Sequence, residues 1–242
     1  MTAVVLQARI DSTRLPGKSL LPLGGKPMVS RVMEALKIIP ADLYVLACPS
    51  ACAGVFEPLA RDQGFVLSPG PKADVLARYC IAIRRFGIKR VIRATADNPF
   101  VFADAARALN AEAEKLGANY AGYSGLPFGA GVESVDSGAL LRAEKDAVLP
   151  GEREHVCPYL YNHGEIFSLH RPLAPKRWRE PAMRLSVDTR DDYERAVLLY
   201  EVLLRQAFPD GGRFNGAAII AAARGLHAGS GGADTRVVRE FK

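Results

Sequence analysis

Residues 4–27 read VVLQARIDSTRLPGKSLLPLGGKP, and the stretch changes character part-way along. Its first residues, as far as Leu6, are apolar and rich in valine, which is typical of a buried strand. The residues from Arg9 to Lys18 instead carry cations, hydroxyl groups and a glycine. In open α/β sheets, ligands bind beyond the carboxyl ends of the strands. The stretch therefore predicts a central strand with a binding loop at its end.

The rest of the chain repeats the change from strand to helix. Short apolar runs suited to strands lie at residues 3–8, 42–48, 64–68, 89–96 and 118–123. Stretches with helical periodicity lie between them, at residues 27–37, 53–62, 73–86 and 102–115. Such alternation predicts an α/β fold with a mostly parallel central sheet and helices on both faces.

The 242 residues suffice for one full-sized hydrophobic core. We expect a single domain over residues 1–228, with insertions within about residues 124–183 that form walls of a substrate pocket. A helix is predicted from Thr189, its N-cap, with acidic residues in its first turn. The small, polar composition after it predicts a flexible tail over residues 229–242.

The composition says more about the cellular compartment of the protein than about the class of ligand that it binds. The formal charge of +6 is compatible with a small anionic substrate and with nucleic acid, so its sign decides neither. The four cysteines form no C-x-x-C pair, which disfavours a zinc site or a disulfide framework and fits a reducing cytoplasm. The sequence shows neither a secretory leader nor an apolar run of membrane-spanning length. We therefore expect a cytoplasmic protein that does not bind membranes.

The loop after the first strand has the side chains that a polyphosphate needs. Such a ligand requires several charged donors from different directions and a backbone that can approach closely. The candidates are Arg9, Ser12, Thr13, Arg14, Gly17 and Lys18. The glycine spacing matches neither the P-loop nor the G-x-G-x-x-G dinucleotide motif. The alternative is an ordinary solvated basic loop.

The loop also resembles that of a known family. The pattern R-x-x-S-T-R-L-P-G-K, followed by L-x-P-L-x-G-K-P, is similar to the signature loop of the cytidylyltransferases that make CMP-activated sugars, such as the CMP-KDO synthetases. Four further stretches resemble the branch that contains the spore coat polysaccharide biosynthesis protein F: DVLARY (74–79), RATADNPF (93–100), EREHVCPYLY (152–161) and RLSVDTRDDYE (184–194). The resemblance implies a Rossmann-like nucleotide-diphospho-sugar transferase fold.

Two aspartates are candidate ligands for Mg²⁺. Asp97 and Asp188 each follow an apolar run, so a doubly wound sheet brings them to the same edge. Mg²⁺ commonly takes one or two carboxylates and completes its shell with phosphate oxygens and water, and the family places metal-binding aspartates at both positions. The alternative is that the two residues only cap helices. Asp191 and Asp192 are interpreted as acids of a first helical turn.

The resemblance also suggests where the base and the acceptor bind. It places cytosine near Ala8 and Ala47, with Arg78 close to it. The predicted acceptor wall comprises Asn98, Glu133, Arg153, Glu154 and His155. In the alternative interpretation, Arg153 and Glu154 form surface ion pairs and His155 is structural. The sequence departs from the family at Cys48-Pro49-Ser50 and at Gly131-Val132-Glu133, so the base contacts and the acceptor stay open.

These observations predict a Mg²⁺-dependent cytidylyltransferase. It would convert CTP and an acidic sugar, phosphosugar or phosphonate into a CMP-conjugate and pyrophosphate, for surface polysaccharide or glycoconjugate synthesis. Lys18, Arg14 and Asp97 are the expected catalytic residues, and a homodimer is suggested by resemblance. Two alternatives are a nucleotide-sugar-dependent glycosyltransferase of the same fold and a non-catalytic nucleotide-binding module. Nucleic acid is not an expected partner, because the cations gather in one loop.

Overall fold

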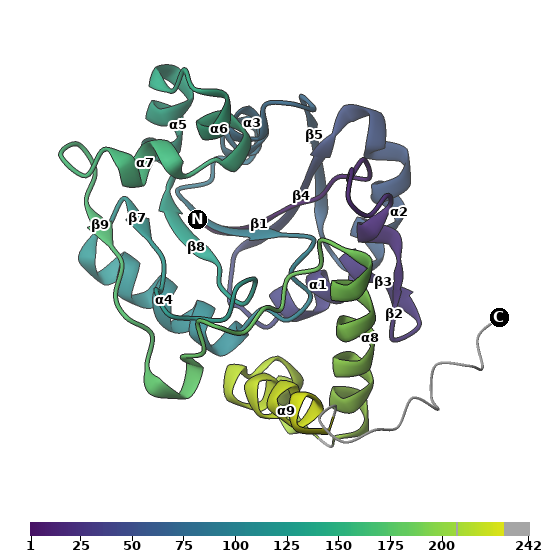
Figure 1. The fold of residues 1–242 in the computed structure, drawn as a ribbon. Coiled ribbons are helices and arrows are strands. Elements are labelled where there is room, and N and C mark those ends of the chain that lie inside the picture. Colours follow the sequence, from purple (N-terminus) through teal and green to yellow (C-terminus); the bar gives the residue numbers. More distant parts are fainter. Residues whose placement is uncertain (207, 230–242) are drawn as a thin grey trace.

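The computed structural model describes residues 1–206 and 208–229, and a seven-stranded sheet runs through this part of the chain (Figure 1). The strands lie in the order β5-β4-β1-β6-β8-β7-β9. Their bounds are β1 Thr2–Gln7, β4 Leu43–Pro49, β5 Val66–Gly70, β6 Arg90–Thr95, β7 Tyr120–Ala121, β8 Glu133–Asp136 and β9 Leu169–His170. A separate small hairpin pairs β2 (Pro22–Leu23) with β3 (Lys26–Pro27). The predicted α/β fold with a mostly parallel sheet is confirmed.

Helices follow most of the strands, as the periodicity of the sequence predicts. Their bounds are α1 Met28–Leu36, α2 Ala53–Asp62, α3 Val75–Phe86, α4 Ala103–Leu116, α5 Ser137–Asp146, α6 Pro150–His155, α7 Pro158–Asn162, α8 Arg190–Arg205 and α9 Gly216–Gly229. The predicted tail lies outside the described residues from position 230 onward.

β1 is central to the sheet because it pairs in parallel with β4 on one side and β6 on the other. Ala3 through Leu6 are fully buried, so both faces of this strand lie inside the protein. At its carboxyl end, Gln7 is in register with Ala47 of β4 and with Thr95 of β6. The loops that follow these three strands therefore start at the same edge of the sheet.

β8 is an antiparallel strand that the sequence pattern did not reveal. It lies beside β6, and Arg93 is in register with Glu133. Because β8 runs in the opposite direction, its first residues lie near the carboxyl end of β6. The antiparallel direction of β8 therefore brings Glu133, from the insertions predicted within residues 124–183, to the carboxyl edge of the sheet.

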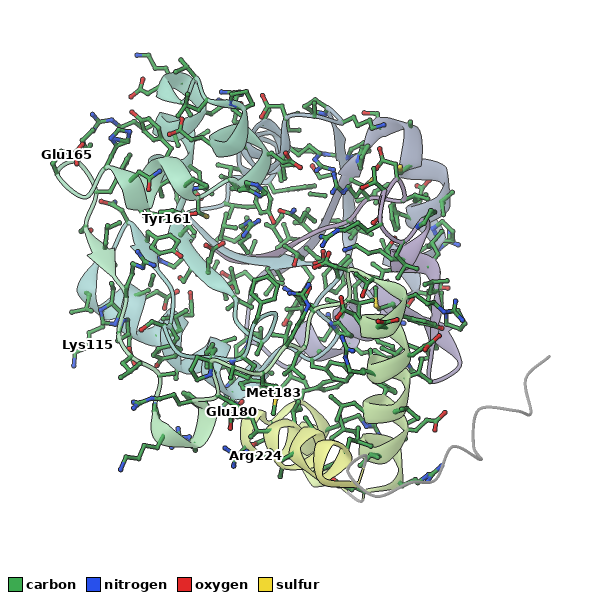
Figure 2. The ribbon with its side chains drawn as sticks, viewed as in Figure 1. Lys115, Tyr161, Glu165, Glu180, Met183 and Arg224 are labelled. Atoms are coloured by element: carbon green, nitrogen blue, oxygen red, sulfur yellow. The ribbon has the colours of Figure 1, made fainter. Side chains whose placement is uncertain are left out.

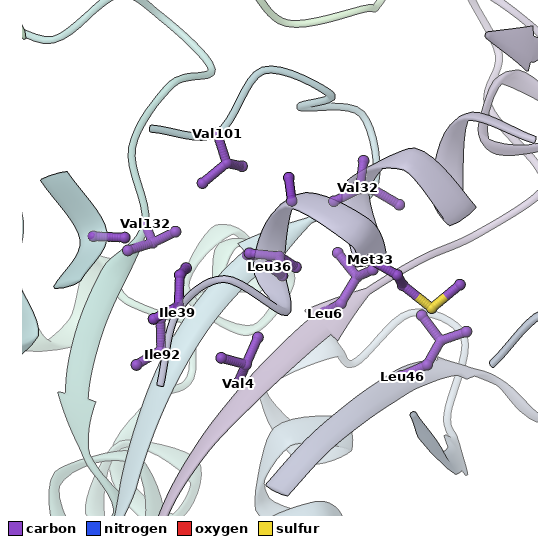
Figure 3. Packing of buried hydrophobic residues seen from close by; sticks show 14 of the residues in the cluster. Val4, Leu6, Val32, Met33, Leu36, Ile39, Leu46, Ile92, Val101 and Val132 are labelled. Carbon is purple, nitrogen blue, oxygen red and sulfur yellow. The ribbon is translucent and has the colours of Figure 1, made fainter. Parts of the chain in front are cut away.

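Separate layers of helices cover the two faces of the sheet (Figure 1). On one face, α1 and α4 pack against alternate residues of β1 and β6, including Val4, Leu6 and Ile92 (Figure 3). On the other face, α3 and α5 pack against the intervening residues, such as Val5 and Val91. The alternation follows from the two-residue period of a strand, and it buries the sheet between the two layers.

A third cluster of buried residues joins α8 and α9 to the segment before α8. Trp178 is among its largest buried side chains, and its indole Nε1 donates to Asp104 Oδ2 at 2.8 Å. Arg224 of α9 reaches Glu180 in the same region, where Nε donates to Oε2 at 2.9 Å (Figure 2). This cluster supports the chain that leads into Asp188.

Candidate functional site

The polar loop after β1 is folded by its own backbone. The amides of Ser12 and Gly17 both donate to the carbonyl oxygen of Ile10, at 3.0 Å. Gly17 has a φ of 67°, in the left-handed region where glycine carries no Cβ penalty. It precedes the short 3-10 helix η1 (Lys18–Leu20). Gly17 does not line the pocket at this edge of the sheet, and its contribution is the turn that leads to Lys18.

Lys18 is the most enclosed of the three cations of the loop. Its side chain is 9% exposed, compared with 55% for Arg9 and 63% for Arg14. Its Nζ lies 2.8 Å from Asp97 Oδ2 and 2.9 Å from Asp188 Oδ1. It also donates to the carbonyl oxygen of Val187 at 3.0 Å. Three acceptors satisfy the three N–H groups of the ammonium, so the fold brings the two predicted metal ligands together around one lysine.

Asp188 lies among several cations. Arg14 Nη2 contacts its Oδ1 at 2.9 Å, and Arg184 Nη2 contacts its Oδ2 at 2.5 Å. Burial raises the pKa of Asp188, but the hydrogen bond and charge of Lys18, with the charges of Arg14 and Arg184, outweigh burial and lower that pKa below its ordinary value. This carboxylate therefore stays ionised at neutral pH.

Neither aspartate is a helix cap, which removes the alternative interpretation of the pair. The N-cap of α8 is Thr189, whose hydroxyl oxygen accepts from the amide of Asp192 at 3.2 Å. The carboxylate of Asp192 in turn accepts from the amide of Thr189 at 3.0 Å, which completes a capping box. α4 begins at Ala103, well beyond Asp97. Both Asp97 and Asp188 instead direct their carboxylates toward Lys18.

A polar cavity of about 350 Å³ opens at this edge of the sheet. Most of the residues predicted for the site line it: Ala8, Arg9, Ser12, Thr13, Arg14, Lys18, Arg78, Asp97, Asn98, Glu154, His155 and Asp188. Gly17, Ala47, Glu133 and Arg153 are not among its lining residues. The cavity is large enough for a small organic ligand.

Arg78 is a buried guanidinium that faces this cavity from α3. The residue is only 2% exposed, and its Nε and Nη1 have no hydrogen-bond partner among the described residues. Burial lowers the pKa of the guanidinium below its ordinary value, because the charged form is poorly solvated there. An unpaired buried charge is costly, so this side chain is suited to a ligand that supplies acceptor atoms.

Two predicted residues are engaged in contacts away from the cavity. The carbonyl oxygen of Ala47 accepts from the amide of Ala8 at 3.0 Å, and the side chain of Ala47 is buried in the core. Glu133 forms an ion pair with Arg93 and accepts from the hydroxyl of Tyr120 at 2.9 Å. The structure therefore places Glu133 behind a residue that lines the cavity.

Arg153 also points away from the cavity, because structural partners satisfy its guanidinium. Its Nε donates to Asp74 Oδ2 at 2.7 Å, and its Nη1 donates to the carbonyl oxygens of Glu144 and Ala147. Asp74 is itself the N-cap of α3. Arg153 thus ties α6 to α3 and to the end of α5. Its neighbours in the sequence behave differently, since Glu154 and His155 do line the cavity.

The sequence interpretation missed several lining residues, including Gln7, Arg93 and Thr95. Gln7 and Thr95 are the last residues of β1 and β6, and Arg93 lies within β6. All three fall inside the strands predicted at residues 3–8 and 89–96, so they were interpreted as strand residues. A polar residue at the carboxyl end of an otherwise apolar strand is the signal that could have identified Gln7.

The donor set fits a magnesium ion that arrives with phosphate groups. Among the described residues, no group of three or more His, Cys, Asp or Glu side chains could hold a metal by itself. Two carboxylates are nevertheless enough for Mg²⁺ when phosphate oxygens and water complete its shell. Asp97 and Asp188 are the two carboxylates that would hold such an ion. Within the part of the chain that the structure describes, no helix has both the length and the apolar character to cross a membrane.

Comparison with known proteins gives consistent matches. The model of the Cytidylyltransferase family matches residues 3–209. Spore coat polysaccharide biosynthesis protein SpsF of Bacillus subtilis (strain 168) is 29% identical over 204 residues, which cover 81% of this chain and 85% of that protein.

Solved structures share the fold. A cytidylyltransferase from Leptospira borgpetersenii superimposes with a TM-score of 0.83 at 23% identity, over 94% of this chain and 95% of that one. CMP:2-keto-3-deoxy-manno-octonic acid synthetase, solved in complex with CTP, gives a TM-score of 0.65 at 16% identity, over 83% of this chain and 98% of that one. At these identities the likeness establishes the Rossmann-like nucleotidyltransferase architecture.

Proposed function

The chain belongs to the cytidylyltransferase family, and from that premise we propose that it transfers the cytidylyl group of CTP to a small acceptor and releases pyrophosphate. The proposed acceptor is an acidic sugar, a phosphosugar or a phosphonate used in surface glycan synthesis. An oxygen of the acceptor would form a bond to the α-phosphorus while the bond from that phosphorus to the pyrophosphate oxygen breaks. No covalent intermediate with the protein is needed.

The observation that carries this proposal is the unpartnered guanidinium of Arg78. Cytosine presents neighbouring acceptor atoms, O2 and N3, and a buried arginine without protein partners would gain both hydrogen bonds and charge stabilisation from them. A Cβ on Gly70 of β5 would lie 2.8 Å from Arg78 Cγ, so the arginine is held closely against β5. The nucleoside is therefore proposed to bind on the β4–β5 side of β1.

The triphosphate is proposed to bind the loop of residues 9–18. The side chains of Arg9 and Arg14 are more than half exposed, so their guanidinium groups can turn toward phosphate oxygens at little cost in free energy. Lys18 would exchange an aspartate for a phosphate as the nucleotide binds. Its charge contact would become stronger as negative charge accumulates on the leaving pyrophosphate, which is how such a residue accelerates transfer.

Asp97 and Asp188 would hold Mg²⁺ together with phosphate oxygens of the nucleotide. When bound, the ion would supply neutralisation of charge at the reacting and leaving phosphate groups. The protein's own contribution is to fix the two carboxylates at one point. Lys18 links them directly, and the backbone holds the same geometry, since the amide of Val187 donates to the carbonyl oxygen of Asp97 at 2.8 Å.

A pyrophosphate-release assay with CTP and Mg²⁺ tests the proposal. Suitable acceptor probes are 3-deoxy-manno-octulosonate, glucose 1-phosphate and phosphonoacetate, one for each proposed class. We expect release with at least one probe, and we expect Asp97→Asn to abolish it while the circular dichroism spectrum stays unchanged. Normal turnover by a folded Asp97→Asn variant would contradict the metal-ligand role, and release with none of the probes would contradict the proposed acceptor classes.

A further inference from the structure

Gln7 is a half-buried amide at the carboxyl end of β1. Its Oε1 accepts a hydrogen bond from Arg93 Nη2 at 3.2 Å. The hydroxyl of Tyr79 lies 3.2 Å from the same oxygen. Gln7 also lines the polar cavity, so the side chain has one end in a protein network and the other toward the ligand space.

The network fixes which end of the amide faces the cavity. A guanidinium can only donate hydrogen bonds, so the atom that faces Arg93 must be the oxygen of Gln7. The amide plane then directs Nε2 away from Arg93. Among the described residues, no protein acceptor takes a hydrogen bond from this nitrogen, although the oxygen has two neighbours. Gln7 thus presents a pair of N–H donors without a protein partner.

The groups behind Gln7 are themselves held in place. Arg93 forms an ion pair with Glu133, and both side chains are largely buried. Tyr120 donates to the other carboxylate oxygen of Glu133 at 2.9 Å, and Tyr79 is fully buried against the sheet. Because Glu133 neutralises Arg93, the polar group offered to a ligand at this point is the neutral amide of Gln7. Nη1 and Nη2 of Arg93 are both engaged, whereas its Nε has no hydrogen-bond partner among the described residues. A connected network of this kind keeps such a donor oriented.

Gln7 and Arg78 reach opposite sides of β1. Arg78 packs against Gly70 of β5, beyond β4. Gln7 instead contacts Arg93 of β6, which is paired with Glu133 of β8. If Arg78 binds the nucleoside on the β4–β5 side, the space on the β6–β8 side is left for the second substrate. The loop of residues 9–18 emerges from β1, between the two.

We infer that Gln7 is a specificity-determining residue of the acceptor site, where its Nε2 donates to an oxygen atom of the acceptor. This inference rests on the proposed cytidylyl transfer. It gives Glu133 an indirect part in acceptor binding, as a positioning residue that acts through Arg93 and Gln7. The acceptor must therefore carry a hydroxyl, carbonyl or acid oxygen at this point, besides the oxygen that attacks the phosphorus.

The test compares Gln7→Glu and Gln7→Met with Gln63→Glu, a matched control at the end of α2, outside the cavity. Glutamate keeps the length and the contacts with Arg93 and Tyr79 but replaces the donor by an acceptor. Methionine removes the donor without adding charge. We expect both Gln7 variants to bind CTP with Mg²⁺ within about twofold of the wild type, and to lose about tenfold or more in kcat/KM for the probe that the wild type uses.

Two results of these binding and kinetic assays would overturn the inference. A tenfold loss of CTP affinity in both Gln7 variants would place the residue in the nucleotide site, and an unchanged kcat/KM for the acceptor would remove it from acceptor binding.

The orientation has a readout that needs no acceptor. In protein labelled with ¹⁵N-glutamine, the Gln7 side-chain amide should be rigid on the ps–ns timescale and should become mobile in Arg93→Lys. An amide as mobile as that of the exposed Gln206 would contradict the inference. The proposed function can fail separately: if the wild-type protein bound no CTP but the Gln7 amide were rigid, the proposed function would be contradicted and the orientation of Gln7 would not.

Discussion

Replacing Lys18 with methionine should open the carboxylate pair to a free divalent cation. The ammonium of Lys18 contacts both Asp97 and Asp188, so it lies where a metal bound by these two residues would be repelled by it. Methionine has a stem of similar length and no charge. We therefore expect Lys18→Met to bind Mn²⁺ without nucleotide more tightly than the wild type does.

The expected gain follows from Coulomb's law. Two unit charges about 4 Å apart interact by roughly 1 kcal/mol in water and roughly 4 kcal/mol near a protein surface, and a divalent ion doubles either value. The side chain of Asp97 is 30% exposed, so we use the lower value, the one for water, for the repulsion between the ammonium and the metal. Removal of the ammonium then favours the metal by about 2 kcal/mol, which corresponds to about a 30-fold lower Kd.

Electron paramagnetic resonance of free Mn²⁺ at low ionic strength measures this Kd directly. Lys115→Met is the matched control, because Lys115 lies near the end of α4 and points outward from the fold (Figure 2). It removes the same charge without touching either aspartate. A Kd for Lys18→Met equal to that of the wild type, in a variant with a normal thermal transition, would refute the reasoning.

Three further predictions follow from single side chains. Arg78→Met should weaken CTP binding by tenfold or more in a calorimetric titration. Its free energy of unfolding should stay unchanged or rise by about 1 kcal/mol, because an unpaired buried charge is removed. An unchanged affinity for CTP would exclude a contact between Arg78 and the base. Asp188→Asn should lower the free energy of unfolding at neutral pH. The difference from the wild type should shrink as the pH falls below 3.8, the ordinary pKa of the group, because a lowered folded-state pKa contributes stability only while the carboxylate is ionised. Chemical denaturation at several pH values measures this difference, and a difference that grows toward low pH would contradict the prediction. Gly129→Ala should destabilise the fold by about 1–3 kcal/mol, because Gly129 has a φ of 91° and the added Cβ would lie 2.6 Å from the amide nitrogen of Ser186. An unchanged melting temperature would contradict this clash.

The sequence predicted the parts of the fold that local patterns determine. The apolar run before Ala8 identified the central strand, and the apolar runs before Asp97 and Asp188 predicted that both carboxylates reach the same edge. The family resemblance stated from the loop of residues 9–18 is confirmed by the match over residues 3–209.

The missing parts depend on contacts between distant segments. Lys18 meets Asp97 and Asp188 across 79 and 170 positions, which no local pattern encodes. The short, antiparallel β8 has too few residues to show a period, yet it brings Glu133 to Arg93. For the same reason the sequence could not show that Glu133 would neutralise Arg93 or that the neighbouring Gln7 would line the cavity.

The central claim is that the loop and Arg78 together hold CTP, and a thermal-shift comparison of CTP, UTP, ATP and GTP, each with and without Mg²⁺, tests it most directly. A ligand present at 100 times its Kd stabilises the native state by about 2.7 kcal/mol, which raises the melting temperature of a domain of this size by about 5–10 °C. We predict such a shift for CTP, larger with Mg²⁺ than without it, and smaller shifts for the other nucleotides. An equal or larger shift with UTP, ATP or GTP would contradict the account.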